Sequence, residues 1–211
     1  MRFSNRSQAG RQLGQAVRKL NLERPVVLGL PRGGVVTALE VARELGAELD
    51  VVLVRKLRAP QNPELAIGAL SEGGQVFLLP YAQSMSTPEY LEAEIQNQKD
   101  VLLKRSQLYR KVRPQVPLAG RNVILVDDGI ATGSTMAAAL ESVLSQAPAR
   151  VVVAVPVAPR EAAQKFGARA EFFALDLPEY FGAVGAFYQD FPQVEDQEVI
   201  SLLKTNTGPG V

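Results

Sequence analysis

The sequence predicts an α/β fold, in which a mostly parallel, twisted sheet is flanked by helices on both faces. Short aliphatic and β-branched runs alternate along the chain with segments of helical periodicity. These runs are apolar throughout instead of alternating with polar residues, which is typical of strands buried on both faces of a parallel sheet. The 211 residues, 46% hydrophobic and 21% charged, suit one soluble globular domain with a full core.

The first half of the chain is expected to supply alternating helices and buried strands. In order, these are a helix over 9–20, a strand over 25–30, a helix over 35–45 and a strand over 49–54. Two further apolar runs, 65–70 and 76–79, flank the turn Glu72-Gly73-Gly74. They predict a hairpin or a mobile flap.

The second half continues the alternation after a long polar helix over 88–112. The expected elements are a strand over 122–126, a helix over 135–144, a strand over 151–155, a helix over 159–166 and a strand over 171–175. No internal repeat or low-complexity linker divides the chain. We therefore expect a single domain over 1–211, with its core at about 22–175, a small hood at about 176–203 and a disordered tail at 204–211.

The chain contains no histidine and no cysteine. It therefore cannot form disulfides, thiolate or imidazole zinc sites, or the usual serine and cysteine hydrolase triads. Any bound metal is expected to be a hard cation held by carboxylates and phosphates, and Mg²⁺ is the natural candidate. The absence of cysteine also fits a reducing, cytoplasmic location.

The net charge of +1 provides no field that would draw the protein to nucleic acid or a membrane. No run of about 18 apolar residues predicts a membrane span, and residues 1–10 lack the apolar stretch of a secretory signal. We expect neither a nucleic-acid nor a membrane partner. The basic residues of the 88–112 helix are interleaved with acids and glutamines, which favours a solvated face or a subunit contact, as in a homodimer.

The segment 123–135, VILVDDGIATGST, joins a buried strand to a helix through two acids and a turn of small residues. The turn offers consecutive backbone N–H groups and hydroxyls at a helix N-terminus, which suits a phosphate dianion. Gly133 would let the backbone approach closely. Asp127 and Asp128 follow the strand, where carboxylates can accept hydrogen bonds from a ribose diol. The simpler alternative is a helix-capping turn after a polar strand end.

This pattern resembles the signature with which type I phosphoribosyltransferases bind 5-phosphoribosyl-1-pyrophosphate (PRPP). Its A-T-G form is most similar to the adenine enzymes. The resemblance implies that Asp127 and Asp128 bind the ribose hydroxyls. It implies that the 5-phosphate is bound by Ala131, Thr132, Gly133, Ser134 and Thr135. It also implies the phosphoribosyltransferase fold, with a C-terminal hood and a flexible loop.

A second anion site is indicated by Leu30-Pro31-Arg32-Gly33-Gly34, where a cation and two glycines stand between a strand and a helix. In the family, the loop at this place binds pyrophosphate, and the peptide joining its first two residues is often cis. The resemblance therefore implies that Arg32, Gly33 and Gly34 bind pyrophosphate and that the Pro31–Arg32 peptide is cis. A helix-entry turn is the simpler alternative.

A basic run, Arg55-Lys56-Leu57-Arg58, follows the second expected strand. The family places a basic residue here to contact pyrophosphate, and we favour Lys56, with Arg55 and Arg58 as alternatives. Surface ion pairing would also explain the run. By the same resemblance, residues 59–74 correspond to the flexible loop that closes over the reacting centre and excludes water.

Near the C-terminus, the segment 177–181 (LPEYF) and the later Asp190 are similar to the hypoxanthine-guanine enzymes. In those enzymes the aromatic residue after the proline stacks on the purine, and a following aspartate helps to organise the metal and pyrophosphate. The resemblance implies that Phe181 stacks on the base and Arg169 reads it. It implies that Asp190 is a metal-side acid, with Mg²⁺ held mainly by PRPP. A core aromatic is the simpler explanation of Phe181.

One departure concerns proton transfer. The 6-oxopurine enzymes carry an acid, proposed to handle the N7 proton of the base, where this chain has Ala131. Either Glu72 or Asp190 acts instead, or the base arrives deprotonated, or the substrate is not a 6-oxopurine. The A-T-G turn points to adenine enzymes and the C-terminal segment to 6-oxopurine enzymes, so the base stays open.

These features predict a Mg²⁺-dependent phosphoribosyltransferase of nucleotide salvage, which transfers 5-phosphoribose from PRPP to a nitrogenous, purine-like base. Such a reaction needs no protein nucleophile, because the protein positions PRPP, neutralises the leaving pyrophosphate and excludes water. The predicted catalytic residues are Arg32, Lys56, Asp127 and Asp128. One alternative is a PRPP-binding regulatory protein with little turnover. Another is a sugar-phosphate hydrolase or phosphorylase on the same scaffold.

Overall fold

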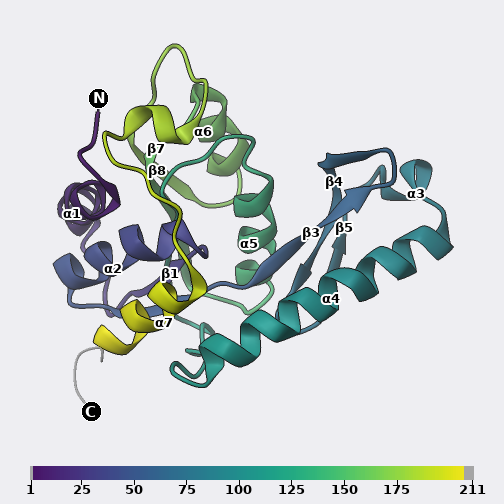
Figure 1. Ribbon diagram of the computed structural model, residues 1–211. Coiled ribbons are helices and arrows are strands. Elements are labelled where there is room, and N and C mark those ends of the chain that lie inside the picture. The colour runs from purple at the N-terminus through teal and green to yellow at the C-terminus, as the bar shows by residue number, and fades with distance from the viewer. Residues whose placement is uncertain (1, 207–211) are drawn as a thin grey trace.

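The computed structural model describes residues 2–206 and has a five-stranded parallel sheet beside a three-stranded antiparallel one (Figure 1). The large sheet has the order β2-β1-β6-β7-β8. Its strands are β1 (Val26–Gly29), β2 (Glu48–Val51), β6 (Asn122–Val126), β7 (Arg150–Val157) and β8 (Glu171–Asp176). Every neighbouring pair in it runs parallel. The predicted α/β class is therefore confirmed.

Helices cover both faces of the large sheet (Figure 1). One face carries α1 (Arg6–Val17), α2 (Gly33–Leu45) and α7 (Asp196–Thr205), and the other carries α5 (Ser134–Leu144) and α6 (Arg160–Gly167). In β6, Ile124 and Val126 pack into the first core, and Val123 and Leu125 into the second. Because both faces of this strand are buried, its sequence reads as a continuous apolar run.

The small sheet projects from the main body together with a long helix (Figure 1). It consists of β3 (Val54–Ala59), β4 (Asn62–Ser71) and β5 (Val76–Leu78), in that order and antiparallel. The long helix is α4 (Pro88–Arg110), and the short α3 (Ala82–Met85) precedes it. Thr87 caps α4 by accepting a hydrogen bond from the Tyr90 N–H, and Pro88 occupies its first turn.

The expected hairpin over 65–70 and 76–79 is confirmed as β4 and β5, whereas the expected strand over 49–54 is wrong in extent. β2 ends at Val51, and Val54 already belongs to β3 of the other sheet. Much of the expected flexible segment 59–74 forms β4. The basic run in β3 has no apolar alternation, so its pairing with β4 was not visible in the sequence.

The two ends of the described chain add elements to the core. α1 begins where Asn5 accepts a hydrogen bond from the Gln8 N–H, and it buries Leu13 and Val17 against α2. Two 3-10 turns, η1 (Arg18–Leu20) and η2 (Val184–Phe187), lie in connections. α7 was not predicted, and it includes Lys204 and Thr205 of the expected tail, whose residues 207–211 lie outside the described residues. Over residues 2–206, no helix combines the length and apolarity that crossing a membrane requires.

Candidate functional site

The loops that follow β1 and β6 lie side by side at the carboxyl edge of the large sheet. From β1 the chain passes through α2 to β2, and from β6 it passes through α5 to β7 on the opposite side. Ligands bind at such a reversal of strand order in open α/β sheets. The Leu30 N–H donates to the Val126 carbonyl at 2.9 Å, so the 31–34 loop is brought next to the acid pair.

Two glycines allow this close approach. A Cβ atom on Gly33 would lie 2.2 Å from Asp128 Oδ2, and one on Gly34 would lie 2.6 Å from Asp127 Oδ1. Both distances are far inside van der Waals contact, so any side chain would displace the acids. The Pro31–Arg32 peptide is cis, as the resemblance implied.

The two carboxylates are tightly constrained. Asp127 Oδ1 accepts the Asp128 N–H at 2.8 Å, and Arg6 Nε donates to Asp128 Oδ2 at 2.7 Å. The Tyr188 hydroxyl donates to the Asp128 carbonyl. Burial raises the pKa values of both carboxyls above their ordinary value. The negative charge of Asp128 raises the pKa of Asp127 further. At Asp128 the hydrogen bond and charge of Arg6 oppose the rise.

The predicted phosphate turn leads directly into α5. Gly133 precedes the helix with φ +74°, and the first helical hydrogen bond runs from the Ala137 N–H to the Gly133 carbonyl. The first N–H groups of a helix have no intrahelical acceptor, so they are available to an anion. From α6, Lys165 Nζ donates to the Thr132 carbonyl at 2.9 Å and adds a cation beside the turn.

If the turn 131–135 binds the 5-phosphate of PRPP, we predict that Gly133→Ala will weaken that binding about tenfold, as calorimetry can measure. The positive φ costs a side chain about 1–2 kcal/mol, so the free turn would relax and would pay this cost on binding, which corresponds to about a tenfold change in affinity. The added Cβ would also lie 3.0 Å from Phe166 Cζ and 3.2 Å from Lys165 Nζ. Gly167→Ala is the control, because a Cβ there meets nothing within 4 Å and affinity should not change. Equal affinity of the two variants would contradict the prediction.

The basic residues of β3 have different environments. Arg58 Nε donates to Glu94 Oε1 of α4 at 2.9 Å, and Arg55 Nε donates to Gln98 Oε1 at 2.9 Å. Both are therefore engaged by the long helix. Lys56, the favoured residue, contacts only the exposed Glu64, at 3.8 Å, among the salt bridges of the described residues. Its role in pyrophosphate binding stays a prediction.

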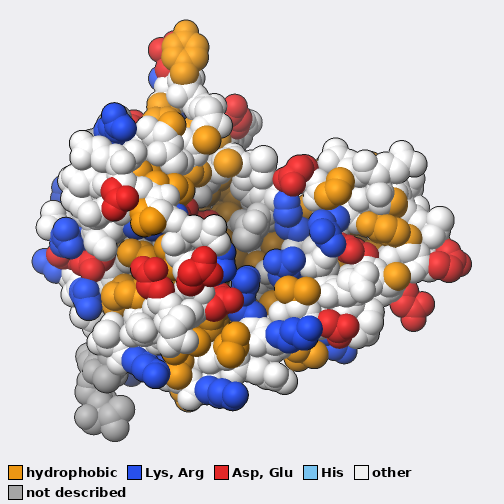
Figure 2. All heavy atoms as spheres, viewed as in Figure 1, with side chains coloured by type: hydrophobic (Ala, Val, Ile, Leu, Met, Phe, Trp, Pro, Cys, Tyr) orange, Lys and Arg blue, Asp and Glu red, His pale blue; other side chains and the backbone are white. Residues whose placement is uncertain are grey.

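Other cations gather near the 31–34 loop. Arg55 and Arg105 line a small cavity with Pro31 and Thr135, so they lie between the two predicted anion loops. Burial, and then the nearby charge of Arg105, lowers the pKa of Arg55. Figure 2 shows Lys and Arg side chains gathered in the hollow between the main body and the projecting sheet.

The 31–34 loop and α4 are joined to the start of α7 by two ion pairs. Arg32 Nη1 lies 3.3 Å from Glu195 Oε2, and Arg105 Nε lies 3.4 Å from Asp196 Oδ1. Surface pairs of this kind are weak. A stronger anion can therefore compete for the guanidinium of Arg32.

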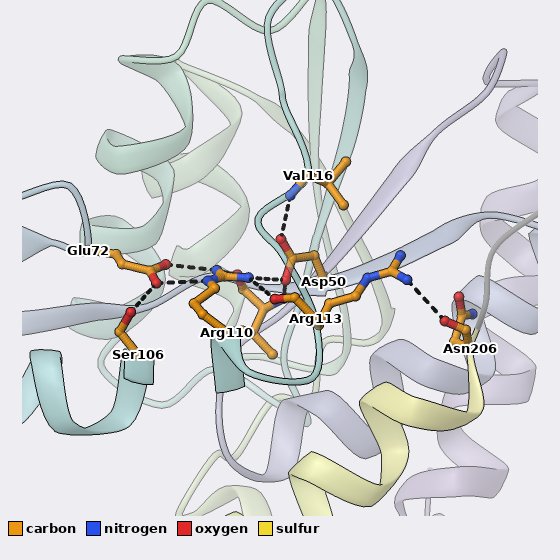
Figure 3. Close-up of polar contacts among 8 residues, drawn as sticks. Asp50, Glu72, Ser106, Arg110, Arg113, Val116 and Asn206 are labelled. Atoms are coloured by element: carbon orange, nitrogen blue, oxygen red, sulfur yellow. Dashed lines mark hydrogen bonds and ion pairs between the residues drawn. The ribbon is translucent and has the colours of Figure 1, made fainter. Parts of the chain in front are cut away.

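Glu72 is part of an ion-pair network at the base of the projecting sheet (Figure 3). Arg110 Nη2 donates to Glu72 Oε2 at 2.7 Å, and Arg110 Nη1 donates to Asp50 Oδ1 at 2.6 Å. Burial raises the pKa of Glu72, but hydrogen bonds from Arg110 and Ser106 outweigh it, and the net shift is downward. A carboxylate so occupied is unsuited to accept a substrate proton.

The hood places aromatic side chains beside the phosphate turn. Residues 178–182 line an open pocket together with Ala131 and Thr132. The ring of Phe181 stacks on Phe187, with centroids 5.3 Å apart. The neighbouring Tyr180 is 86% exposed, so it is a second aromatic that a base could meet. The assignment of Phe181 to the base stays a prediction.

The structure does not bring the other two C-terminal candidates to this pocket. Arg169 pairs with Glu141 of α5 and lines another cleft, between α5 and the small sheet, which meets this pocket at Thr132. Asp190 is exposed, and its N–H donates to the Ser4 carbonyl. Across residues 2–206, no three acidic side chains gather into a metal-binding group.

Three cations near the site were not predicted. These are Arg6, Arg105 and Lys165, which come from α1, α4 and α6. Arg6 left a signal in the sequence, because it continues the helical spacing of the buried positions Ala9 and Leu13. A charged residue on an apolar stripe needs a partner inside the protein.

The family described as Phosphoribosyl transferase domain matches residues 6–171 of the chain. Over 204 residues the chain is 41% identical to the Mycobacterium tuberculosis (strain ATCC 25618 / H37Rv) protein named "Putative phosphoribosyl transferase Rv0571c". That alignment covers 95% of this chain and 46% of the relative, so the chain spans about half the length of the curated relatives it matches.

Two solved structures share the fold. The crystal structure of TT1426 from Thermus thermophilus superposes with a TM-score of 0.91 and 56% identity, covering 97% of this chain and 99% of that one. A hypothetical protein from Neisseria gonorrhoeae with bound ppGpp has a TM-score of 0.52 and 15% identity over 97% of this chain and 98% of its own. The second likeness concerns the fold alone.

Proposed function

Because the chain belongs to the phosphoribosyl transferase domain family, we propose that it transfers 5-phosphoribose from PRPP to a nitrogenous base and releases pyrophosphate. One observation carries the proposal. The acid pair after β6, which leads into the predicted phosphate turn, lies against the Arg32-Gly33-Gly34 loop at the switch point of the sheet. In this arrangement two carboxylates that can accept hydrogen bonds from a ribose diol would lie between two anion-binding loops.

Each group would have a separate task in binding PRPP. Asp127 and Asp128 would accept hydrogen bonds from the ribose hydroxyls, and the turn 131–135 would hold the 5-phosphate with N–H groups and hydroxyls. Arg32 and Lys56 would bind the pyrophosphate, together with the N–H groups of the glycine pair. Arg55 and Arg105 would add positive charge behind that group.

The reaction would then break the bond between the anomeric carbon and the pyrophosphate oxygen, whose electron pair leaves with pyrophosphate. A nitrogen of a base that arrives deprotonated would donate its electron pair to the same carbon and form the new bond through an oxocarbenium-like state. Arg32 and Lys56 would stabilise the negative charge that grows on the leaving group, and the acids would fix the ribose. Closure of the small sheet would exclude water.

Mg²⁺ fits this site as a companion of the substrate. With no cluster of three acids in residues 2–206, the oxygens of PRPP would have to supply most of its ligands. The ion would neutralise charge on the pyrophosphate. We extend the proposal to a purine-like base in nucleotide salvage, with Phe181 or Tyr180 against its ring.

A PRPP-binding regulator with little turnover is the second candidate. It is favoured by the state of two candidate positions for a proton acceptor, since residue 131 is alanine and Glu72 is held by Arg110. The two candidates share the PRPP site, so binding alone would not separate them.

A binding titration followed by a base panel tests the proposal. We expect PRPP with Mg²⁺ to bind in calorimetry, and at least one purine-like base to give pyrophosphate release that depends on the base. Absence of binding at millimolar PRPP would remove both candidates. Binding without release for any base would favour the regulator, and release without a base would indicate a hydrolase.

A further inference from the structure

Arg6 lies at the centre of the site although it belongs to the N-terminal helix. Its Nε donates to Asp128 Oδ2 at 2.7 Å, and its Nη1 donates to the Pro192 carbonyl at 2.6 Å. The guanidinium carbon stands 3.6 Å from the ring centroid of Phe191. A Cβ on Gly33 would come within 2.8 Å of Arg6 Nε. The side chain is thus enclosed by the acid pair, the loop after β1 and the hood.

These contacts hold the guanidinium in one place. The side chain of Arg6 is 9% exposed and that of Asp128 is 15% exposed, so both charges are largely removed from water. A buried arginine retains its charge, and a buried charge without a partner is costly. The contacts to Pro192 and Phe191 come from a different segment from Asp128, so they fix the direction from which the carboxylate is approached.

We propose that Arg6 is a positioning residue for the ribose of PRPP, and that its guanidinium keeps the Asp128 carboxylate ionised and oriented to accept hydrogen bonds from the diol. The inference rests on the proposed function. Arg6 acts through Asp128, because its Nε donates to one oxygen of that carboxylate.

The charged groups around Asp128 define the expected pH effect. Arg6 faces it from α1, Asp127 from the same loop and Tyr188 from the hood. Burial raises the pKa of Asp128, and Arg6 opposes that rise, whereas Asp127 and Tyr188 carry no positive charge. Removing Arg6 would therefore raise the pKa of Asp128 further. PRPP binding would then be lost at a higher pH on acidification.

The test measures PRPP affinity by calorimetry, with Mg²⁺, as a function of pH. We expect Arg6→Met to weaken binding by about 10- to 100-fold, the range for hydrogen bonds to charged groups. Arg6→Lys should recover part of the affinity, because it restores the charge. Arg11→Met is the control: it removes another cation of α1, which is half exposed and lies 3.5 Å from Glu40. Its affinity should match the wild type.

A double-mutant cycle shows whether Arg6 acts through Asp128. In an Asp128→Asn background, Arg6→Met should change affinity by no more than about twofold, because the coupling partner is gone. In this double variant position 128 carries no charge that needs Arg6, so it guards against misfolding of the single variant. Three results would overturn this inference and leave the proposed function intact. They are additive effects of the two substitutions on PRPP affinity, a full affinity of Arg6→Met, and a loss of its PRPP binding on acidification at the same pH as in the wild type. A wild-type protein that does not bind PRPP would overturn the proposed function as well.

Discussion

Replacing Asp127 and Asp128 together by alanine should abolish PRPP binding at millimolar ligand. Each carboxylate is proposed to accept a charge-assisted hydrogen bond, for which about 1.5–3 kcal/mol is typical. Loss of both would lower affinity by at least about 100-fold. Calorimetry with PRPP and Mg²⁺ measures the effect, and circular dichroism checks that the fold is retained. Unchanged affinity would show that the acids only terminate the strand.

The exposed Asp100 offers a matched control for the loss of a carboxylate. It accepts a hydrogen bond from Gln96 on α4 and lies outside the proposed site. Asp100→Ala should therefore bind PRPP as the wild type does. An equal loss of affinity in this variant would attribute the effect to net charge instead of the site.

Removing the charge of Asp127 should stabilise the folded protein, although it should weaken PRPP binding. The folded state raises the pKa of Asp127, chiefly by burial and then by the charge of Asp128. A raised folded pKa means that the native state holds the proton more tightly, so this carboxyl destabilises the protein as pH rises through that pKa. Asp127→Asn, which is neutral and similar in shape, should melt at a higher temperature at pH 7. Sites built for binding often carry such a cost in stability.

Replacing Arg110 by methionine should destabilise the protein by about 3–5 kcal/mol, the range for breaking a buried ion pair. The substitution would leave Asp50, which is 1% exposed, without its cation, although the Val116 N–H would still donate to it. Glu72 would lose two hydrogen bonds from the same guanidinium (Figure 3). Chemical denaturation measures the difference in unfolding free energy.

An exposed ion pair between an arginine and a glutamate provides the comparison for the buried pair of Arg110. Arg150 forms two hydrogen bonds with Glu171, but their side chains are 40% and 46% exposed, so Arg150→Met should cost no more than about 1 kcal/mol. The loss of unfolding free energy caused by Arg110→Met should become smaller as pH falls, because protonated Asp50 and Glu72 no longer need a counter-ion. Equal costs for the two variants, or a deficit that does not depend on pH, would contradict this account.

The elements that sequence alone predicted are those whose signal is local. β6 was found in full because its apolar run and the following acids are contiguous. β3 was missed because its basic run has no apolar alternation, although its partner β4 follows directly along the chain. α7 was missed because its residues gain burial from α2 and α4, which lie far away in the sequence.

The same distinction applies to the candidate site. The acid pair and the turn could be predicted, because one segment carries both. Arg6 could not be matched to Asp128, since 122 residues separate them and only the fold joins α1 to β6. Arg169 was placed by its position in the chain, but the direction of its side chain depends on Glu141 of α5.

The network of Arg110 bears on how the projecting sheet is attached. α4 has 23 residues, about 35 Å at 1.5 Å per residue, and Arg110 anchors its last turn to Asp50 of the main sheet. The same guanidinium binds Glu72, and Arg105 pairs with Asp196 near the same end of the helix. A rotation of the projecting part about this end would displace the opposite tip, near α3, the most.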